Sequence, residues 1–157
     1  MPKTLEAILT EAIDDEYKAR AIYRLVLRTF GDIKPFTKIV EAESRHIEAL
    51  LTLFDKYDIC VPVDEWPEKV AVPGSILEAC EIGLSAEIEN AAMYDKLLSA
   101  ADDYPDVLAV LKNLQRASQE NHLPAFQRCV DRGGSAGGGQ GMGKGMGKRR
   151  RQGRCGN

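Results

Sequence analysis

The sequence predicts an all-α fold, a four-helix bundle made of two helical hairpins joined by a long crossover. Four long segments place apolar residues at alternating spacings of three and four, the pattern of helices that pack in a bundle. Short turns join the first segment to the second and the third to the fourth, whereas residues 58–74 form a longer, proline-containing connection. A chain of 157 residues is long enough to bury one core of this kind.

The first segment is predicted from about Thr4 to Phe30, where Gly31 ends it. The second begins near Pro35, a residue favoured in a first helical turn, and runs to about Tyr57. The inward positions of the first are Leu5, Leu9, Ala12, Glu16, Ala19, Tyr23, Val26 and Phe30, and those of the second are Phe36, Ile39, Glu43, His46, Ile47, Leu50, Phe54 and Tyr57. A glutamate on a buried face is costly unless it has a partner, so Glu16 and Glu43 are each expected to pair with another polar group or an ion.

The third segment opens with a capping box, because Ser75 precedes Glu78 by three residues. The fourth has Pro105 near its first turn and is predicted to run as one helix to about Val130. The inward positions are Ile76, Cys80, Gly83, Glu87, Ala91, Tyr94 and Leu98 in the third, and Leu108, Leu111, Gln115, Ser118, His122, Ala125 and Cys129 in the fourth.

Charge and composition divide the chain at about residue 131. Residues 1–131 hold 14 Lys and Arg against 24 Asp and Glu, a balance of −10, and form the predicted bundle domain. Residues 132–157 carry seven basic residues and no acid, and their glycine content predicts a disordered basic tail. We expect this tail to keep the protein in solution, with electrostatic nucleic-acid binding or soft-metal uptake as alternatives.

The four cysteines form no C-x-x-C pair, which excludes zinc-ribbon and rubredoxin-type knuckles. We expect them to be thiols, mostly buried, rather than disulfides. The N-terminus lacks the basic start and apolar block of a secretory signal, and no apolar run reaches membrane-spanning length. These features predict a cytoplasmic protein with no membrane partner.

The two halves of the sequence repeat a polar pattern. The segment "EYKARAIY" at 16–23 matches "EIENAAMY" at 87–94, and "ESRHIEAL" at 43–50 matches "QENHLPAF" at 119–126. A pseudo-twofold arrangement of the halves would gather Glu16, Glu43, His46, Glu87, Gln119 and His122 in one layer. Two glutamates plus two Glu-x-x-His motifs are the ligand set of a di-metal site in a helical bundle, because residues three apart share one helix face.

These motifs resemble those of the ferritin-like superfamily, and of rubrerythrin-type di-iron proteins in particular. The resemblance is closest to the ferritin-like domain of unknown function family 2202, and it is carried by the segments "DEYKARAIY", "PFTKIVEAESRHIEALL", "EIENAAMYDKLL" and "ASQENHLPAFQRC". The resemblance covers about residues 5–130. It implies a ferritin-like four-helix bundle and leaves the biochemical role of the family unsettled.

The pattern departs from a full ligand set at the fourth helix. Gln119 stands where the second Glu-x-x-His motif needs a carboxylate, and it offers only a neutral carbonyl oxygen as a weak ligand. Glu120 would face away on a regular helix, but a bulge caused by Pro124 would turn it inward as an alternative ligand. Asn90 stands where rubrerythrins carry an extra carboxylate.

The sequence thus predicts a non-haem di-metal protein, with iron as the metal and manganese or another divalent ion as the alternative. It would react with O2 or peroxide as an oxidoreductase or ferroxidase, using an external electron donor and forming a homodimer as ferritin-like bundles often do. Tyr23 and Tyr94 are expected to donate hydrogen bonds to metal-bound carboxylates, or else to be core aromatics. The rival hypothesis is a non-enzymatic protein, either a metal-storage or sensing module or an interaction scaffold with a purely structural polar layer.

Overall fold

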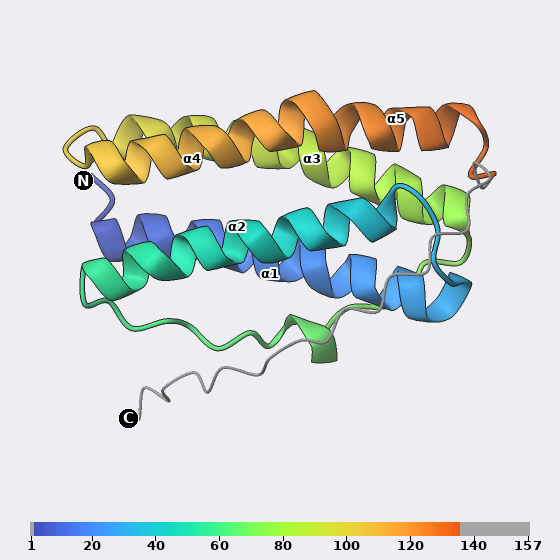
Figure 1. The fold of residues 1–157 in the computed structure, drawn as a ribbon, viewed down its shortest axis with the longest axis horizontal. Coiled ribbons are helices and arrows are strands. Elements are labelled where there is room, and N and C mark those ends of the chain that lie inside the picture. Colours follow the sequence, from blue (N-terminus) through green and yellow to red (C-terminus); the bar gives the residue numbers. More distant parts are fainter. Residues whose placement is uncertain (1, 136–157) are drawn as a thin grey trace.

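The computed structural model describes residues 2–135 and folds them into an all-helical bundle, with no strand in this part of the chain (Figure 1). The elements are α1 (Leu5–Phe30), α2 (Phe36–Lys56), the 3-10 turn η1 (Trp66–Glu68), α3 (Ile76–Ala100), α4 (Pro105–Ala117), the π-turn η2 (Ser118–His122) and α5 (Leu123–Asp131). Helix α1 packs against α2, and α3 packs against α4 and α5. The predicted helical bundle of two hairpins is therefore confirmed.

The helix ends follow the signals in the sequence. The Thr4 hydroxyl accepts a hydrogen bond from the amide of Ala7 at the start of α1. Gly31 ends α1 with φ of 90°, a conformation that favours glycine, and its amide donates to the carbonyl of Leu27. At α3 the Ser75 hydroxyl accepts from the amide of Glu78, while the Glu78 carboxylate accepts from the amide of Gly74 instead of closing the capping box on Ser75.

The crossover between α2 and α3 runs along the length of the bundle (Figure 1). Its η1 turn packs on α1, where the indole Nε1 of Trp66 donates to Asp14 at 2.8 Å. Asp64 receives a hydrogen bond at 3.3 Å from Arg20, also on α1. These contacts fix the path that lets the second hairpin lie beside the first.

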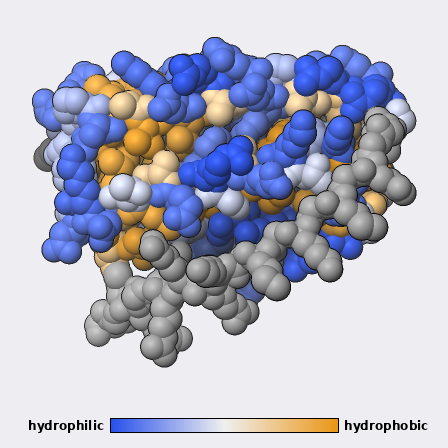
Figure 2. All heavy atoms as spheres, in the orientation of Figure 1, coloured by the Kyte–Doolittle hydropathy of each residue, from blue (hydrophilic) through white to orange (hydrophobic). Residues whose placement is uncertain are grey.

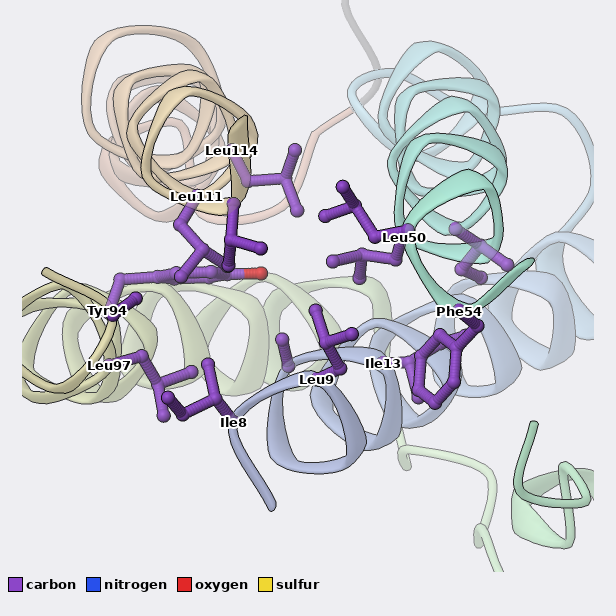
Figure 3. Close-up of a cluster of buried hydrophobic side chains, with 14 of the residues drawn as sticks. Ile8, Leu9, Ile13, Leu50, Phe54, Tyr94, Leu97, Leu111 and Leu114 are labelled. Atoms are coloured by element: carbon purple, nitrogen blue, oxygen red, sulfur yellow. The ribbon is translucent and has the colours of Figure 1, made fainter. Parts of the chain in front are cut away.

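Two apolar clusters fill the interior and leave a polar layer between them. The first lies towards the α1 N-terminus and contains the side chains labelled in Figure 3, which come from α1, α2, α3 and α4. The second is made of Tyr23, Val26, Phe36, Ile39, Ala79, Cys80, Phe126 and Cys129. Along α2, Glu43 stands between Ile39 of the second cluster and Ile47 of the first. The glutamate and histidine positions therefore fall at mid-height.

A disulfide joins Cys80 of α3 to Cys129 of α5, with a Cα–Cα distance of 6.0 Å. Both residues are buried in the second apolar cluster, as expected, but the expectation of free thiols is wrong for this pair and for Cys60, which is also disulfide-bonded. The two cysteines are 49 residues apart, and only the antiparallel packing of α3 and α5 brings them together. Spacing along the chain gave no sign of this pairing.

The C-terminal boundary differs slightly from the predicted one. After α5 the chain makes a turn in which the amides of Gly133 and Gly134 donate to the carbonyls of Val130 and Cys129. Gly134 is buried against the backbone of Leu77. The predicted tail from residue 136 onward, with its basic run, lies outside the described residues. None of the described helices is both long and apolar enough to cross a membrane.

Candidate metal centre

The bundle has four helical rods, namely α1, α2, α3 and the continuous segment of α4, η2 and α5, and each of them contributes to the polar layer. Glu16 comes from α1, Glu43 and His46 from α2, Glu87 from α3, and His122 from the end of η2. The three carboxylates and His122 are buried, with relative exposures of 3 to 4%. His46 is partly buried, with 13% of its side chain exposed. These are five of the six residues that the sequence repeat placed in one layer.

The five side chains form two ligand groups that share Glu43. In the first group, Nδ1 of His46 lies 3.2 Å from Glu16 Oε2 and 3.4 Å from Glu43 Oε2. In the second, Nδ1 of His122 lies 3.4 Å from Glu43 Oε1 and 3.3 Å from Glu87 Oε1. Within each group the ligand atoms all lie within 4.8 Å of one another. The imidazole rings are stacked with their centroids 5.6 Å apart. The two oxygens of Glu43 therefore face two separate histidines.

The glutamates and histidines of the layer shift one another's pKa values. Burial opposes the charged imidazolium, but the hydrogen bonds to the carboxylates prevail and raise the pKa of His46 to about 10 and that of His122 to about 9. Burial and the neighbouring Glu43 raise the pKa of Glu16 to about 8. Burial acts in the same direction on Glu43, yet hydrogen bonds to Glu16 and to both histidines hold its pKa below the usual value. Both histidines are therefore protonated at neutral pH when only protons occupy the layer.

The two tyrosines of the repeat behave differently. The Tyr94 hydroxyl donates to Glu16 Oε1 at 2.7 Å, as expected of a tyrosine that supports a ligand carboxylate. The Tyr23 hydroxyl is buried and has no hydrogen-bond partner among the described residues, so the expected contact is absent. Its ring packs against Phe36 and Phe126, with centroid distances of 5.7 and 5.3 Å. Tyr23 is thus a core aromatic with an unused donor beside the layer.

A π-turn changes the ligand set predicted for the fourth rod. Gln119 and Glu120 are both exposed, so the prediction that Gln119 joins the layer as a weak ligand is wrong, and the alternative in which Glu120 turns inward is not realised. Ser118 faces the layer instead, and its hydroxyl donates to Glu87 Oε2. The amide of Leu123 bonds to the carbonyl of Ser118, five residues back. In this wider turn residues four apart, rather than three apart, share the inner face.

Pro124 accounts for the position of the π-turn. A proline has no amide hydrogen, so it cannot donate to the carbonyl of Glu120, four residues earlier. The bulge that the sequence offered as an alternative is therefore present, but it brings Ser118 rather than Glu120 to the inner face. Ser118 had been placed on the inner stripe of this helix, four residues before His122, and that spacing was the usable clue.

Asp15 and Asn90 form a second polar contact at the edge of the layer that the sequence reasoning missed. Asn90 Nδ2 donates to Asp15 Oδ2 at 2.6 Å. Burial raises the pKa of Asp15 to about 6. Both residues line a small cavity of about 40 Å³ with Tyr23, Glu43 and Glu87. Asp15 lies in the acidic run "DDE", and such a run usually indicates a solvated helix face, so the sequence does not indicate this contact.

Comparison with known proteins finds one uncharacterized relative. No family model matches the chain. The uncharacterized protein MJ0754 of Methanocaldococcus jannaschii is 30% identical over 142 residues, which cover 81% of this chain and 75% of that protein. The crystal structure of the hypothetical protein MJ0754 from Methanococcus jannaschii DSM 2661 superposes with a TM-score of 0.74 at 26% identity, covering 91% of each chain. The similarity thus extends over most of both proteins and names no activity.

Proposed function

The chain belongs to the same family as the uncharacterized protein MJ0754, and we propose that its glutamate–histidine layer is a di-iron centre in a ferritin-like bundle of the rubrerythrin type. The observation that carries the proposal is the shared position of Glu43. One buried carboxylate belongs to two ligand groups and presents a different oxygen to each histidine. Such a carboxylate is suited to bridging two ions.

The spacing of the ligand atoms supports metal binding. Ligand atoms bonded to one ion at 2.0–2.2 Å lie about 3 Å apart when their bonds are roughly perpendicular. The nitrogen-to-oxygen gaps of 3.2 to 3.4 Å in both groups are close to this value. Each group needs only small side-chain movements to close on an ion. The unused hydroxyl of Tyr23 offers a further hydrogen-bond donor, and Tyr23 lines the same small cavity as Glu43 and Glu87.

The donor chemistry favours a first-row transition metal. Three carboxylates and two imidazoles suit iron, with manganese as the principal alternative. Bound iron would supply redox chemistry towards O2 or peroxide. The chain itself supplies the surroundings of the centre. The Tyr94 hydroxyl donates a hydrogen bond to Glu16, and the Ser118 hydroxyl donates one to Glu87 and orients it. The two apolar clusters exclude water on either side of the layer. An oxidoreductase cycle would require an external electron donor, because the sequence contains no C-x-x-C knuckle.

One observation favours the rival, non-enzymatic function. With protonated histidines, the layer already pairs its carboxylates with two positive charges. The same distances therefore describe hydrogen-bonded ion pairs, and such a layer would be stable without metal. In that case the protein would be an interaction scaffold, or it would bind metal without redox turnover.

Anaerobic loading with ferrous iron followed by addition of O2 or H2O2 tests the proposal. We expect protein-bound Fe(II) to be oxidised faster than free Fe(II) in the same buffer, with consumption of the oxidant. The exposed-residue variant Glu48→Gln serves as a control and should behave like the native chain. Metal that binds but is oxidised no faster than free iron would indicate storage or sensing rather than catalysis.

Metal affinity is expected to rise with pH. An ion that takes Nδ1 of His46 or His122 must displace a proton, and the raised pKa values of both rings and of Glu16 keep those protons bound at neutral pH. Affinity should increase by about tenfold per pH unit for each proton displaced. Titration with Mn(II) between pH 6.5 and 8.5, following the free ion by electron paramagnetic resonance, measures this. An affinity independent of pH would contradict the proposed ligands.

Two neighbouring substitutions separate the inner face of the π-turn from its outer face. Ser118→Ala removes the donor to Glu87 and should lower the free energy of unfolding of the metal-free protein by about 1–2 kcal/mol. Gln119→Glu should change that free energy by less than about 0.5 kcal/mol and leave metal content unchanged, because Gln119 is exposed. Urea unfolding and elemental analysis provide the readouts. Tighter metal binding in Gln119→Glu would restore Gln119 as a ligand position.

A further inference from the structure

A wide groove lies between α2 and the rod formed by α4, η2 and α5, with a volume of about 690 Å³. These elements face the viewer in Figure 1, and Figure 2 shows strongly hydrophilic side chains across the middle of the same face. The groove floor includes small residues at Ala42, Ala117 and Ala125, which leave space between the helices. Its volume falls within the range of small-molecule sites.

The groove is basic although the described part of the chain is acidic. It is lined by Lys34, Lys38, Arg45, Arg128 and Arg132. These are five of the fifteen Lys and Arg residues within 2–135, whereas Glu120 is the only groove residue among the twenty-four acids of that range. No ion pair within the described residues engages any of the five cations. The positive charge is therefore available to a ligand.

The cations stand on both walls. Lys34 and Lys38 lie at the start of α2, opposite Arg128 and Arg132 at the end of the antiparallel α5. Arginine and lysine on facing walls can hold phosphate or carboxylate groups from two sides, and the guanidinium does so through two parallel hydrogen bonds. A ligand with at least two anionic groups could contact cations of both walls at once.

The groove leads to the histidine side of the polar layer. His46 and His122 both line it, together with Asn121. Nδ1 of each ring faces the carboxylates, so the ring edge that carries Nε2 is left to the groove. A ligand held by the cations would therefore lie directly against the two histidines.

We propose that this groove binds a small organic polyanion, bearing two or more phosphate or carboxylate groups, next to the histidine pair. The binding depends on the five cations and not on bound metal. If the layer is a redox centre, the polyanion is its substrate or a ligand that regulates access to it.

Calorimetric titration of the metal-free full-length chain with pyrophosphate, and separately with citrate, tests this at 0.15 M NaCl. We expect at least one to bind, and Arg128→Gln with Arg132→Gln to weaken that binding by at least about tenfold. Glu120→Gln should strengthen it, because the single opposing charge is removed. Phosphate and carboxylate ligands are distinguished by which probe binds more tightly.

Two control variants separate the groove from general attraction to basic surfaces. Lys96→Gln with Lys112→Gln removes two exposed charges outside the groove and should leave the affinity within about twofold. Replacing Arg149, Arg150 and Arg151 by Gln tests the basic tail in the same way. Loss of binding in either control, with binding kept in the groove variant, would overturn the proposal, as would no binding of either probe.

NMR of the histidine rings tests whether the bound ligand lies in the groove. The chain has only two histidines, so their ring proton signals can be followed directly by NMR. Addition of the bound probe should shift both signals in the native chain and in the two control variants. Binding without any shift would put the anion elsewhere and would contradict the proposal. Metal content should be unchanged in the groove variant, so failure here is distinct from failure of the metal centre.

Discussion

Glu43→Gln is expected to abolish binding at both positions of the proposed di-metal centre. Glu43 is the one side chain that belongs to both ligand groups, and its two oxygens face His46 and His122 separately. A glutamine of the same size keeps the packing but cannot supply a negative charge to either ion. Metal per chain, measured after anaerobic loading with ferrous iron, should fall from about two to near zero.

Matched variants sharpen this test. Glu48→Gln lies on the same helix at an exposed position and should retain full metal content. Glu16→Gln and Glu87→Gln each alter one ligand group and should chiefly weaken one ion. Undiminished metal in Glu43→Gln would show that the ions, if present, are held somewhere else.

Replacing both Cys80 and Cys129 by serine is expected to cause the largest loss of stability. The disulfide closes a loop between residues 49 positions apart and joins α3 to α5 inside the second apolar cluster. The chain-entropy relation gives a loss of about 4 kcal/mol in the free energy of unfolding for a loop of this length. Serine hydroxyls buried at both positions would add to the loss. Urea unfolding of the double variant and of the native protein measures the difference.

Reduction of the native protein provides a second comparison, because it opens the Cys80–Cys129 disulfide without changing the side chains, although it also opens the disulfide of Cys60. Reduced native protein and the double variant should both be less stable than the oxidised native protein, and reduction of the double variant measures what the Cys60 disulfide adds. A change below about 1 kcal/mol in both would show that packing, rather than the cross-link, holds α3 and α5 together.

The helices and the layer were accessible from the sequence because both depend on local periodicity. Stripes of apolar residues fixed the four rods, and Thr4, Gly31 and Ser75 marked ends that the structure confirms. The repeat places Glu16 and Glu87 at matching points, so the sequence alone predicts five of the inward polar residues. The same information defined the height of the layer between two apolar clusters.

What the sequence did not reveal depended on local distortion or on contacts across the fold. The π-turn moves Ser118 inward and Gln119 outward, a rotation that a regular helical period does not predict. The disulfide and the Asp15–Asn90 contact join residues on different helices, so no spacing along the chain identifies them. The basic groove likewise arises only when α2 and α5 are set side by side.

The measurement that tests the central claim most directly is the metal content of the purified full-length protein. Elemental analysis, with protein concentration determined independently and with no chelator used in purification, should give about two iron or manganese ions per chain. The Glu43→Gln variant prepared in parallel should give almost none. No metal in the native protein, even after anaerobic loading with ferrous iron, would contradict the metal centre and leave the layer as a hydrogen-bonded structural feature.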